Sequence, residues 1–65
     1  MKALKDLREE KGLTQAQLGK ELGLDQTTIS QYERGVREPD FQILKKLRDY
    51  FGVTADYLLG FVEYE

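Results

Sequence analysis

Residues 14–35 of this chain, TQAQLGKELGLDQTTISQYERG, decide the fold, because they predict two short helices joined by a tight turn. Thr14 followed by Gln17 forms a capping box, in which each residue satisfies a free backbone group of the other. Gly23 is free to adopt a positive φ, and Asp25 is placed to cap the second helix. The stretch therefore predicts helices at residues 15–22 and 26–34.

The second of these helices has an unusual polar face. At about 100° per residue, Ile29 and Tyr32 lie on one side of it. The opposite side carries hydroxyls, an amide and one arginine: Thr27, Ser30, Gln31 and Arg34. Hydroxyls and amides both donate and accept hydrogen bonds, as the reading of base edges in a major groove requires. The face therefore favours DNA recognition, and a neutral polar face of a small helical bundle is the alternative.

Four segments of the chain, TQAQLGKELG, DQTTISQYERG, REPD and LKKLRDYFGVTADYLLG, resemble the helix-turn-helix domain of phage repressor and Cro-like (XRE) transcriptional regulators. The resemblance runs from about Leu4 to Gly60 and is specific, because the spacing of all four segments agrees. It implies an all-α, five-helix, lambda-repressor-like DNA-binding domain with the helix-turn-helix at helices two and three. It also implies dimerisation on operator DNA, with the second helix of the motif (about 26–34) in the major groove.

The polar face and the resemblance together predict which residues contact double-stranded DNA. The predicted base readers are Gln26, Thr27 and Gln31. The predicted contacts to the DNA backbone are Thr14, Gln15, Lys20, Thr28, Arg34 and Arg37. Base contacts specify the sequence and phosphate contacts position the protein, so the first set would select the operator. A homodimer would then set the two half-sites of a palindromic operator about one DNA turn apart, roughly 34 Å.

The resemblance also leads to predictions for Arg8 and Gly19. In the resembled family, an arginine at the position of Arg8 pairs with the glutamate that follows the aromatic residue of the recognition helix, here Glu33. A structural ion pair is therefore expected, and an ordinary exposed arginine is the alternative. Gly19 stands where the family usually carries alanine. A glycine inside a helix costs roughly 1 kcal/mol relative to alanine, so Gly19 suggests close packing against a neighbouring helix or some fraying.

The rest of the chain predicts three more helices, at residues 2–11, 41–51 and 53–59. The middle one of these carries Leu44, Leu47 and Phe51 at i, i+3 and i+7, which predicts one apolar stripe. Thr54 would cap the last helix.

A length of 65 residues allows one small domain. We expect it to cover residues 1–65, with 61–65 as a short C-terminal tail. One recognition helix is too small a footprint for a tight specific site, so a homodimer is expected. The expected interface is the fifth helix and the tail, through Leu59, Phe61 and Tyr64.

The composition argues against several other functions. Cysteine and histidine are absent, which excludes the usual thiolate and imidazole metal sites and catalysis by Cys–His or Ser–His pairs. A domain this small rarely encloses the cleft that paired carboxylates need, so we expect neither an enzyme nor a cofactor. No apolar run approaches about 18 residues, so neither a signal peptide nor a membrane span is expected. A reducing, cytoplasmic setting is compatible with this composition.

The net charge of −2 is unusual for a DNA-binding domain, because phosphate contacts supply much of the affinity. From Thr14 to Tyr50, basic and acidic residues are equally numerous. This balance supports a second hypothesis, a protein–protein interaction module (antitoxin-like or a co-regulator) with the same fold. The first hypothesis is a sequence-specific DNA-binding transcriptional regulator, in particular a repressor.

Overall fold

Five helices account for most of residues 1–62, the part of the chain that the computed structural model describes. In chain order they are α1 (Leu4–Glu10), α2 (Gln15–Leu22), α3 (Gln26–Arg34), α4 (Phe41–Phe51) and α5 (Ala55–Leu59). These residues contain no strand, so the prediction of an all-α fold with five helices is confirmed. None of the described helices is long and apolar enough to cross a membrane.

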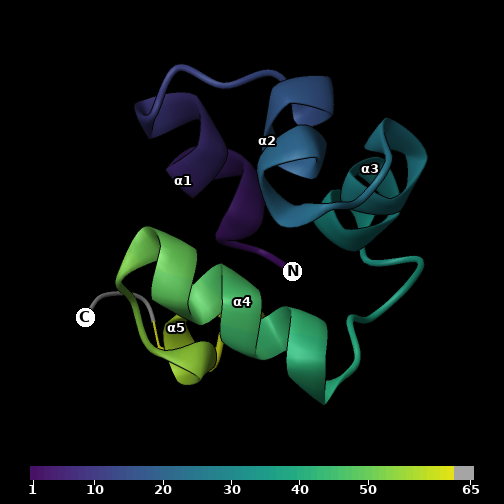
Figure 1. Ribbon diagram of the computed structural model, residues 1–65. Coiled ribbons are helices and arrows are strands. Elements are labelled where there is room, and N and C mark those ends of the chain that lie inside the picture. The colour runs from purple at the N-terminus through teal and green to yellow at the C-terminus, as the bar shows by residue number, and fades with distance from the viewer. Residues whose placement is uncertain (63–65) are drawn as a thin grey trace.

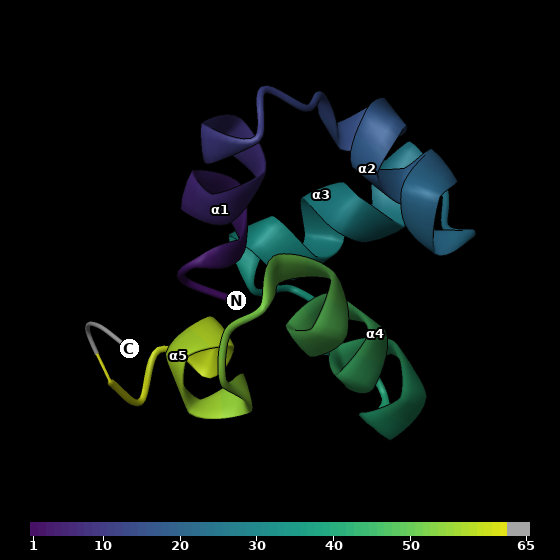
Figure 2. The same ribbon diagram turned by 60° about the vertical axis from the view of Figure 1, so that its left-hand side comes forward.

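The helices form two groups that meet around α3. In Figure 1 and Figure 2, α1 and α2 lie on one side of the molecule and α4 and α5 on the other, with a long connection from α3 to α4 along the edge. Helices α2 and α3 pack against each other as the two arms of the helix-turn-helix. Helix α3 also contacts α1, and α4 contacts α5.

Each helix contributes one fully buried apolar side chain to a single core. These side chains are Leu4, Leu18, Ile29, Leu47 and Leu58, one from each helix in chain order. Tyr32 completes the inward face of α3 and is 2% exposed. All five helices therefore share one core, and burial of such side chains is the main stabilising contribution to the fold.

The predicted caps of the helix-turn-helix are present. The Thr14 hydroxyl accepts a hydrogen bond from the Gln17 backbone N–H at 3.0 Å, and the Thr14 N–H donates to Oε1 of Gln17 at 2.8 Å. The Asp25 carboxylate accepts from the Thr28 N–H at 2.7 Å. Gly23 ends α2 with a φ of 73°. The turn therefore has the conformation that its sequence predicted.

Two helices are shorter than predicted. Helix α1 begins at Leu4 and ends at Glu10, whereas 2–11 was expected, because Ala3 offers no side chain to cap the first turn. Helix α5 begins at Ala55 and not at residue 53, because Thr54 has an extended backbone (ψ 157°) and caps the helix from outside. The bounds of α2, α3 and α4 agree with the prediction.

Candidate nucleic-acid interface

The outward face of α3 is polar and open to solvent. Thr27 and Arg34 are exposed and Gln31 is partly exposed, while Ile29 and Tyr32 on the opposite face are buried. The Arg34 Nε donates to the Ser30 hydroxyl at 3.2 Å, so the arginine side chain lies along the helix. The face thus presents hydroxyls, one amide and one guanidinium without any acidic side chain among them.

The first residues of α2 and α3 lie side by side across the turn. The Gln26 side-chain amide donates to Oε1 of Gln15, with Nε2 and Oε1 3.4 Å apart. The Gln15 amide in turn donates to Oε1 of Glu33 at 3.0 Å. The structure therefore joins a predicted base reader and a predicted backbone contact to a residue near the end of α3. Sequence spacing alone gave no sign of this connection.

The expected ion pair between Arg8 and Glu33 is present, and Glu33 is the residue that connects it to these two hydrogen bonds. Their closest atoms, Arg8 Nε and Glu33 Oε2, are 2.6 Å apart, and a second hydrogen bond joins Nη2 to Oε1 at 3.2 Å. The side chains are only 10% and 5% exposed. The hydrogen bond with Glu33 raises the pKa of Arg8, against the opposing effect of burial. Nη1 also donates to the Leu13 carbonyl at 2.8 Å, which ties the loop after α1 to the pair.

Gly19 is closely packed, but against the turn of the motif and not against another helix. A Cβ built at Gly19 would lie 2.5 Å from the carbonyl oxygen of Leu24. The same backbone segment is held by a hydrogen bond from the Leu24 N–H to the Gly19 carbonyl at 2.7 Å. The expected close packing is therefore present, with the turn as the neighbour. A side chain at this position would meet the backbone that leads into α3.

The remaining predicted backbone contacts belong to α2 and its cap, to α3 and to the loop after α3. Lys20, Thr14 and Arg37 are exposed, and Thr28 is partly exposed. The Arg37 guanidinium lies over the ring of Tyr32, 6.0 Å from its centre, at the exit of α3. The Thr14 hydroxyl is already engaged in the capping box.

Acidic groups also stand close to this surface. Hydrogen bonds from Thr28, its backbone N–H first, lower the pKa of Asp25, and the nearby charge of Arg37 acts in the same direction. The Asp25 carboxylate is therefore ionised at the start of α3. A negative charge there stabilises the helix, because the first turn of a helix carries unpaired N–H groups.

The residues predicted to form a dimer interface differ in their exposure. Leu59 is partly buried and Phe61 is 76% exposed. Tyr64 lies outside the described residues.

Two exposed apolar side chains were not predicted. Val36 is 65% exposed in the loop after α3, and Phe41 is 79% exposed at the start of α4. The position of Phe41 could have been inferred, because it directly follows the capping residue Asp40, where a helix has no preceding turn to pack on. Within residues 1–62, no group of three or more acidic, cysteine or histidine residues could hold a metal ion.

Comparisons with known proteins agree on the nature of this domain. A family model described as helix-turn-helix matches residues 4–58. The HTH-type transcriptional regulator ImmR of Bacillus subtilis (strain 168) is 41% identical over 59 residues, which are 91% of this chain and 46% of that protein. The HTH-type transcriptional activator BcrR of Enterococcus faecalis is 43% identical over 57 residues, or 88% of this chain and 28% of that protein.

A third relative is the cryptic phage CTXphi transcriptional repressor RstR of Vibrio cholerae, 32% identical over 57 residues, or 88% of this chain and 51% of that protein. This chain thus spans about half the length of ImmR and RstR and less of BcrR. No solved structure matches it significantly. The match over residues 4–58 and the five-helix core lead to one conclusion: the chain belongs to the XRE-type, lambda-repressor-like helix-turn-helix family.

Proposed function

We propose that this chain binds double-stranded DNA in a sequence-specific way and regulates transcription, with α3 in the major groove. The observation that carries the proposal is the solvent-exposed face of α3, where Thr27, Gln31 and Arg34 stand opposite the buried Ile29 and Tyr32. A helix has the width that a major groove admits, and amides and hydroxyls match the donors and acceptors of base edges. Relatives named as transcriptional regulators support the same function.

The proposed contacts divide into two sets. Gln26, Thr27 and Gln31 read base edges. Thr14, Gln15, Lys20, Thr28, Arg34 and Arg37 contact the sugar–phosphate backbone, where exposed side chains and the unpaired N–H groups at the start of α2 suit phosphate oxygens. Two copies then occupy the half-sites of a palindromic operator, about 34 Å apart. A repressor that blocks transcription by occupying its operator needs no catalytic group.

One experiment tests the division directly. Operators are first selected from a random DNA pool, and the affinities of variants for the selected site and for random DNA are then compared at several salt concentrations. Gln31→Ala should lower specific binding by about 1–3 kcal/mol and relax the preference at one base pair of each half-site. Arg37→Ala should weaken both kinds of DNA by similar factors and reduce the salt slope by about 0.9 per monomer. Arg48→Ala, at an exposed arginine on α4, is the matched control.

The alternative function is a protein–protein interaction module. The exposed Val36 and Phe41, at the two ends of the connection from α3 to α4, favour it, because a partner protein would cover these apolar side chains. If Gln31→Ala and Arg37→Ala leave DNA binding unchanged, or if the wild-type chain binds no DNA at low salt, this alternative replaces the first. Equal profiles for the two variants would show that α3 does not read bases.

A further inference from the structure

The guanidinium of Arg37 lies over the ring of Tyr32, 6.0 Å from its centre. Tyr32 belongs to the core and is 2% exposed, whereas Arg37 is exposed. The ring is thus fixed by the packing of the core, and the arginine covers it from the solvent side. A cation over the face of an aromatic ring is attracted by the negative charge of the π system.

The backbone that leads to Arg37 is also fixed. Gly35 ends α3 with a φ of 77°, and its N–H donates to the Tyr32 carbonyl at 3.2 Å. The Val36 N–H donates to the Gln31 carbonyl at 3.1 Å. Two such bonds to the last carbonyls of a helix determine the direction of the chain that leaves it. What remains to be fixed is the side chain of Arg37, and the ring of Tyr32 restricts it.

Arg37 differs from the other arginines of the chain in how its N–H groups are used. The others each donate to a side-chain oxygen of the fold: Arg8 to Glu33, Arg34 to Ser30 and Arg48 to Asp49. Within residues 1–62, Arg37 donates no hydrogen bond and forms no ion pair, and its contact is with the face of the ring. The N–H groups of a guanidinium lie in its plane, so stacking on a ring leaves them able to donate to a phosphate.

The charge of Arg37 also acts on the start of α3. Hydrogen bonds from Thr28 are the main cause of the lowered pKa of Asp25, and the charge of Arg37 adds to their effect. The guanidinium therefore lies back toward α3, the helix proposed to enter the major groove.

We propose that the ring of Tyr32 holds the Arg37 guanidinium in place for a phosphate of the DNA backbone. Tyr32 is then a positioning residue for DNA binding in addition to a core residue. This inference rests on the proposed function, which assigns Arg37 a backbone contact, and it names the residue on which that contact depends. A side chain that is already held before binding loses less conformational entropy in the complex, and this strengthens binding.

The first test needs no DNA. The ring current of an aromatic side chain shifts the proton resonances of a group above its face upfield. In the folded wild type, the Hδ protons of Arg37 should therefore resonate upfield of their position in the urea-unfolded chain. Tyr32→Phe should keep this shift, because it keeps the ring. Unshifted Arg37 protons in the folded wild type would overturn the inference, and this measurement does not depend on whether any variant folds.

The second test measures the affinity for random duplex DNA at low salt by fluorescence anisotropy. Tyr32→Phe is compared with Tyr32→pentafluorophenylalanine, which has nearly the same shape but an electron-poor face that no longer attracts a cation. Tyr32→Phe should bind as the wild type does, and the fluorinated variant should bind about two- to fivefold more weakly. In an Arg37→Ala background the two rings should give equal affinities, because the cation that distinguishes them is absent.

Tyr50 provides the matched control. The Lys11 ammonium lies over its ring, 5.1 Å from the centre, and neither residue is a proposed DNA contact. Tyr50→Phe and Tyr50→pentafluorophenylalanine should therefore bind random DNA equally well. Equal losses from fluorination at Tyr32 and at Tyr50, or a loss at Tyr32 that persists in the Arg37→Ala background, would show that the ring acts only through the fold.

The outcomes separate this inference from the proposed function. If Arg37→Ala weakens binding to random DNA but the two rings at Tyr32 give the same affinity, the inference is wrong and the backbone contact of Arg37 stands. If Arg37→Ala has no effect on binding, the proposed backbone contact is itself wrong, and the inference fails with it.

Discussion

Glu33, near the end of α3, accepts a hydrogen bond at 3.0 Å from the side-chain amide of Gln15, at the start of α2. The same carboxylate is paired with Arg8 from α1. One side chain therefore connects three helices, and it also connects an ion pair with little solvent contact to the amides at the surface of the helix-turn-helix. Substitutions at Arg8 or Glu33 should therefore change both the free energy of unfolding and DNA recognition.

Removal of either partner of the ion pair between Arg8 and Glu33 should destabilise the fold strongly. In the intact pair the Arg8 and Glu33 side chains are 10% and 5% exposed, so Arg8→Ala removes the main partner of a carboxylate with little solvent contact, and Glu33→Ala does the same to the guanidinium. We expect each single change to lower the free energy of unfolding by about 3–5 kcal/mol, because an unpaired charge is then buried. Urea denaturation followed by circular dichroism measures this quantity.

The double variant Arg8→Met/Glu33→Leu is the control for this prediction. It removes both charges and keeps most of the volume, so it should cost much less than either single change. If both single variants have wild-type stability, the pair contributes nothing and the two side chains act as ordinary surface groups.

Gly19→Ala should destabilise the domain although alanine is the better helix former. The added methyl group would meet the Leu24 carbonyl oxygen at 2.5 Å, and backbone atoms cannot move aside as a flexible side chain does. We expect a loss of about 1–3 kcal/mol in urea denaturation, since the overpacking exceeds the gain of roughly 1 kcal/mol in helix propensity.

Ala16→Gly in the same helix calibrates this result. Ala16 is exposed, so that change reports helix propensity alone and should cost about 1 kcal/mol. A Gly19→Ala variant more stable than wild type would mean that the turn can open without cost.

The parts of the fold that the sequence predicted best are those where local chemistry decides the backbone. Thr14 and Asp25 were expected to cap α2 and α3, and both accept the N–H three residues later. Helix α1 was predicted less well, because Ala3 makes no side-chain cap and the sequence therefore carries no capping signal at its start.

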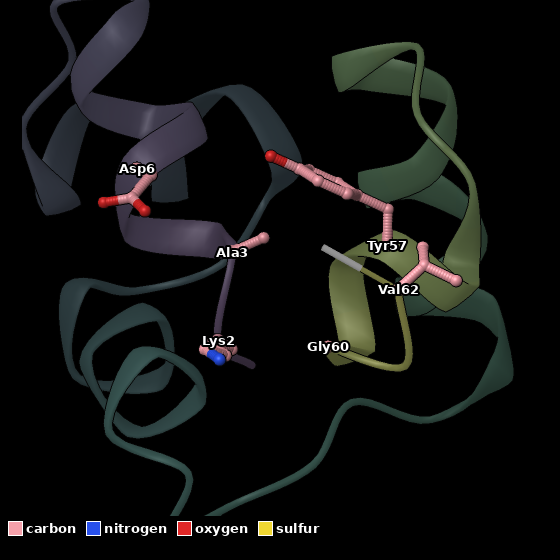
Figure 3. A pocket seen from close by; sticks show the side chains of 6 residues that line it. All are labelled: Lys2, Ala3, Asp6, Tyr57, Gly60 and Val62. Carbon is pink, nitrogen blue, oxygen red and sulfur yellow. The ribbon is translucent and has the colours of Figure 1, made fainter. Parts of the chain in front are cut away.

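The candidate site was predicted only in its separate elements. The polar face of α3 follows from helical geometry, so Thr27 and Gln31 could be named in advance. The contact of Gln15 with Glu33 joins residues 18 positions apart and depends on how closely α2 approaches α3. A pocket lined by Lys2, Ala3 and Asp6 from one end of the chain and by Tyr57, Gly60 and Val62 from the other (Figure 3) likewise depends on the tertiary fold.

Asp25→Ala should lower stability at neutral pH and much less in strong acid. Hydrogen bonds from Thr28 lower the pKa of Asp25 below its usual 3.8. A group whose pKa is lowered by folding stabilises the protein above its unfolded-state pKa, and this contribution is lost as the pH falls through the folded-state value. The stability difference between wild type and Asp25→Ala should therefore be constant above about pH 5 and shrink below 3.8.

Thr14→Ala provides the comparison, because it removes a cap that does not titrate. Its cost should stay the same between about pH 7 and pH 2. If the effect of Asp25→Ala is equally independent of pH, the carboxylate does not stabilise α3 through its charge.

The affinity of this chain for its operator should depend less on salt concentration than is usual for a DNA-binding protein. The proposed cationic contacts are few, and each neutralised phosphate adds about 0.9 to the slope of log affinity against log salt. With about three or four phosphates per monomer, the slope for a dimer should lie near −5 to −7. Fluorescence anisotropy over a salt series measures it. A slope steeper than about −8 would mean that further basic residues, such as Lys45 and Lys46 on α4, reach the DNA.

The last prediction concerns the orientation of the Gln26 amide. Glu33 can only accept hydrogen bonds, so Gln15 must turn its NH₂ group toward it and its Oε1 toward Gln26. Gln26 must then donate to Gln15, which leaves its own oxygen and its second N–H for a base. One acceptor and one donor on the same amide are what bidentate pairing with adenine requires.

Gln26→Ala should therefore cost about 1–3 kcal/mol of specific binding and abolish the preference at its base pair. Gln15→Ala should relax the same preference by a smaller amount and leave the salt slope unchanged, because glutamine carries no charge. Lys20→Ala is the contrasting variant, expected to weaken specific and random DNA alike and to reduce the slope by about 0.9 per monomer. Should Gln15→Ala keep the full base preference, Gln26 is oriented by the DNA itself and not by the contacts that extend from Arg8 through Glu33 and Gln15.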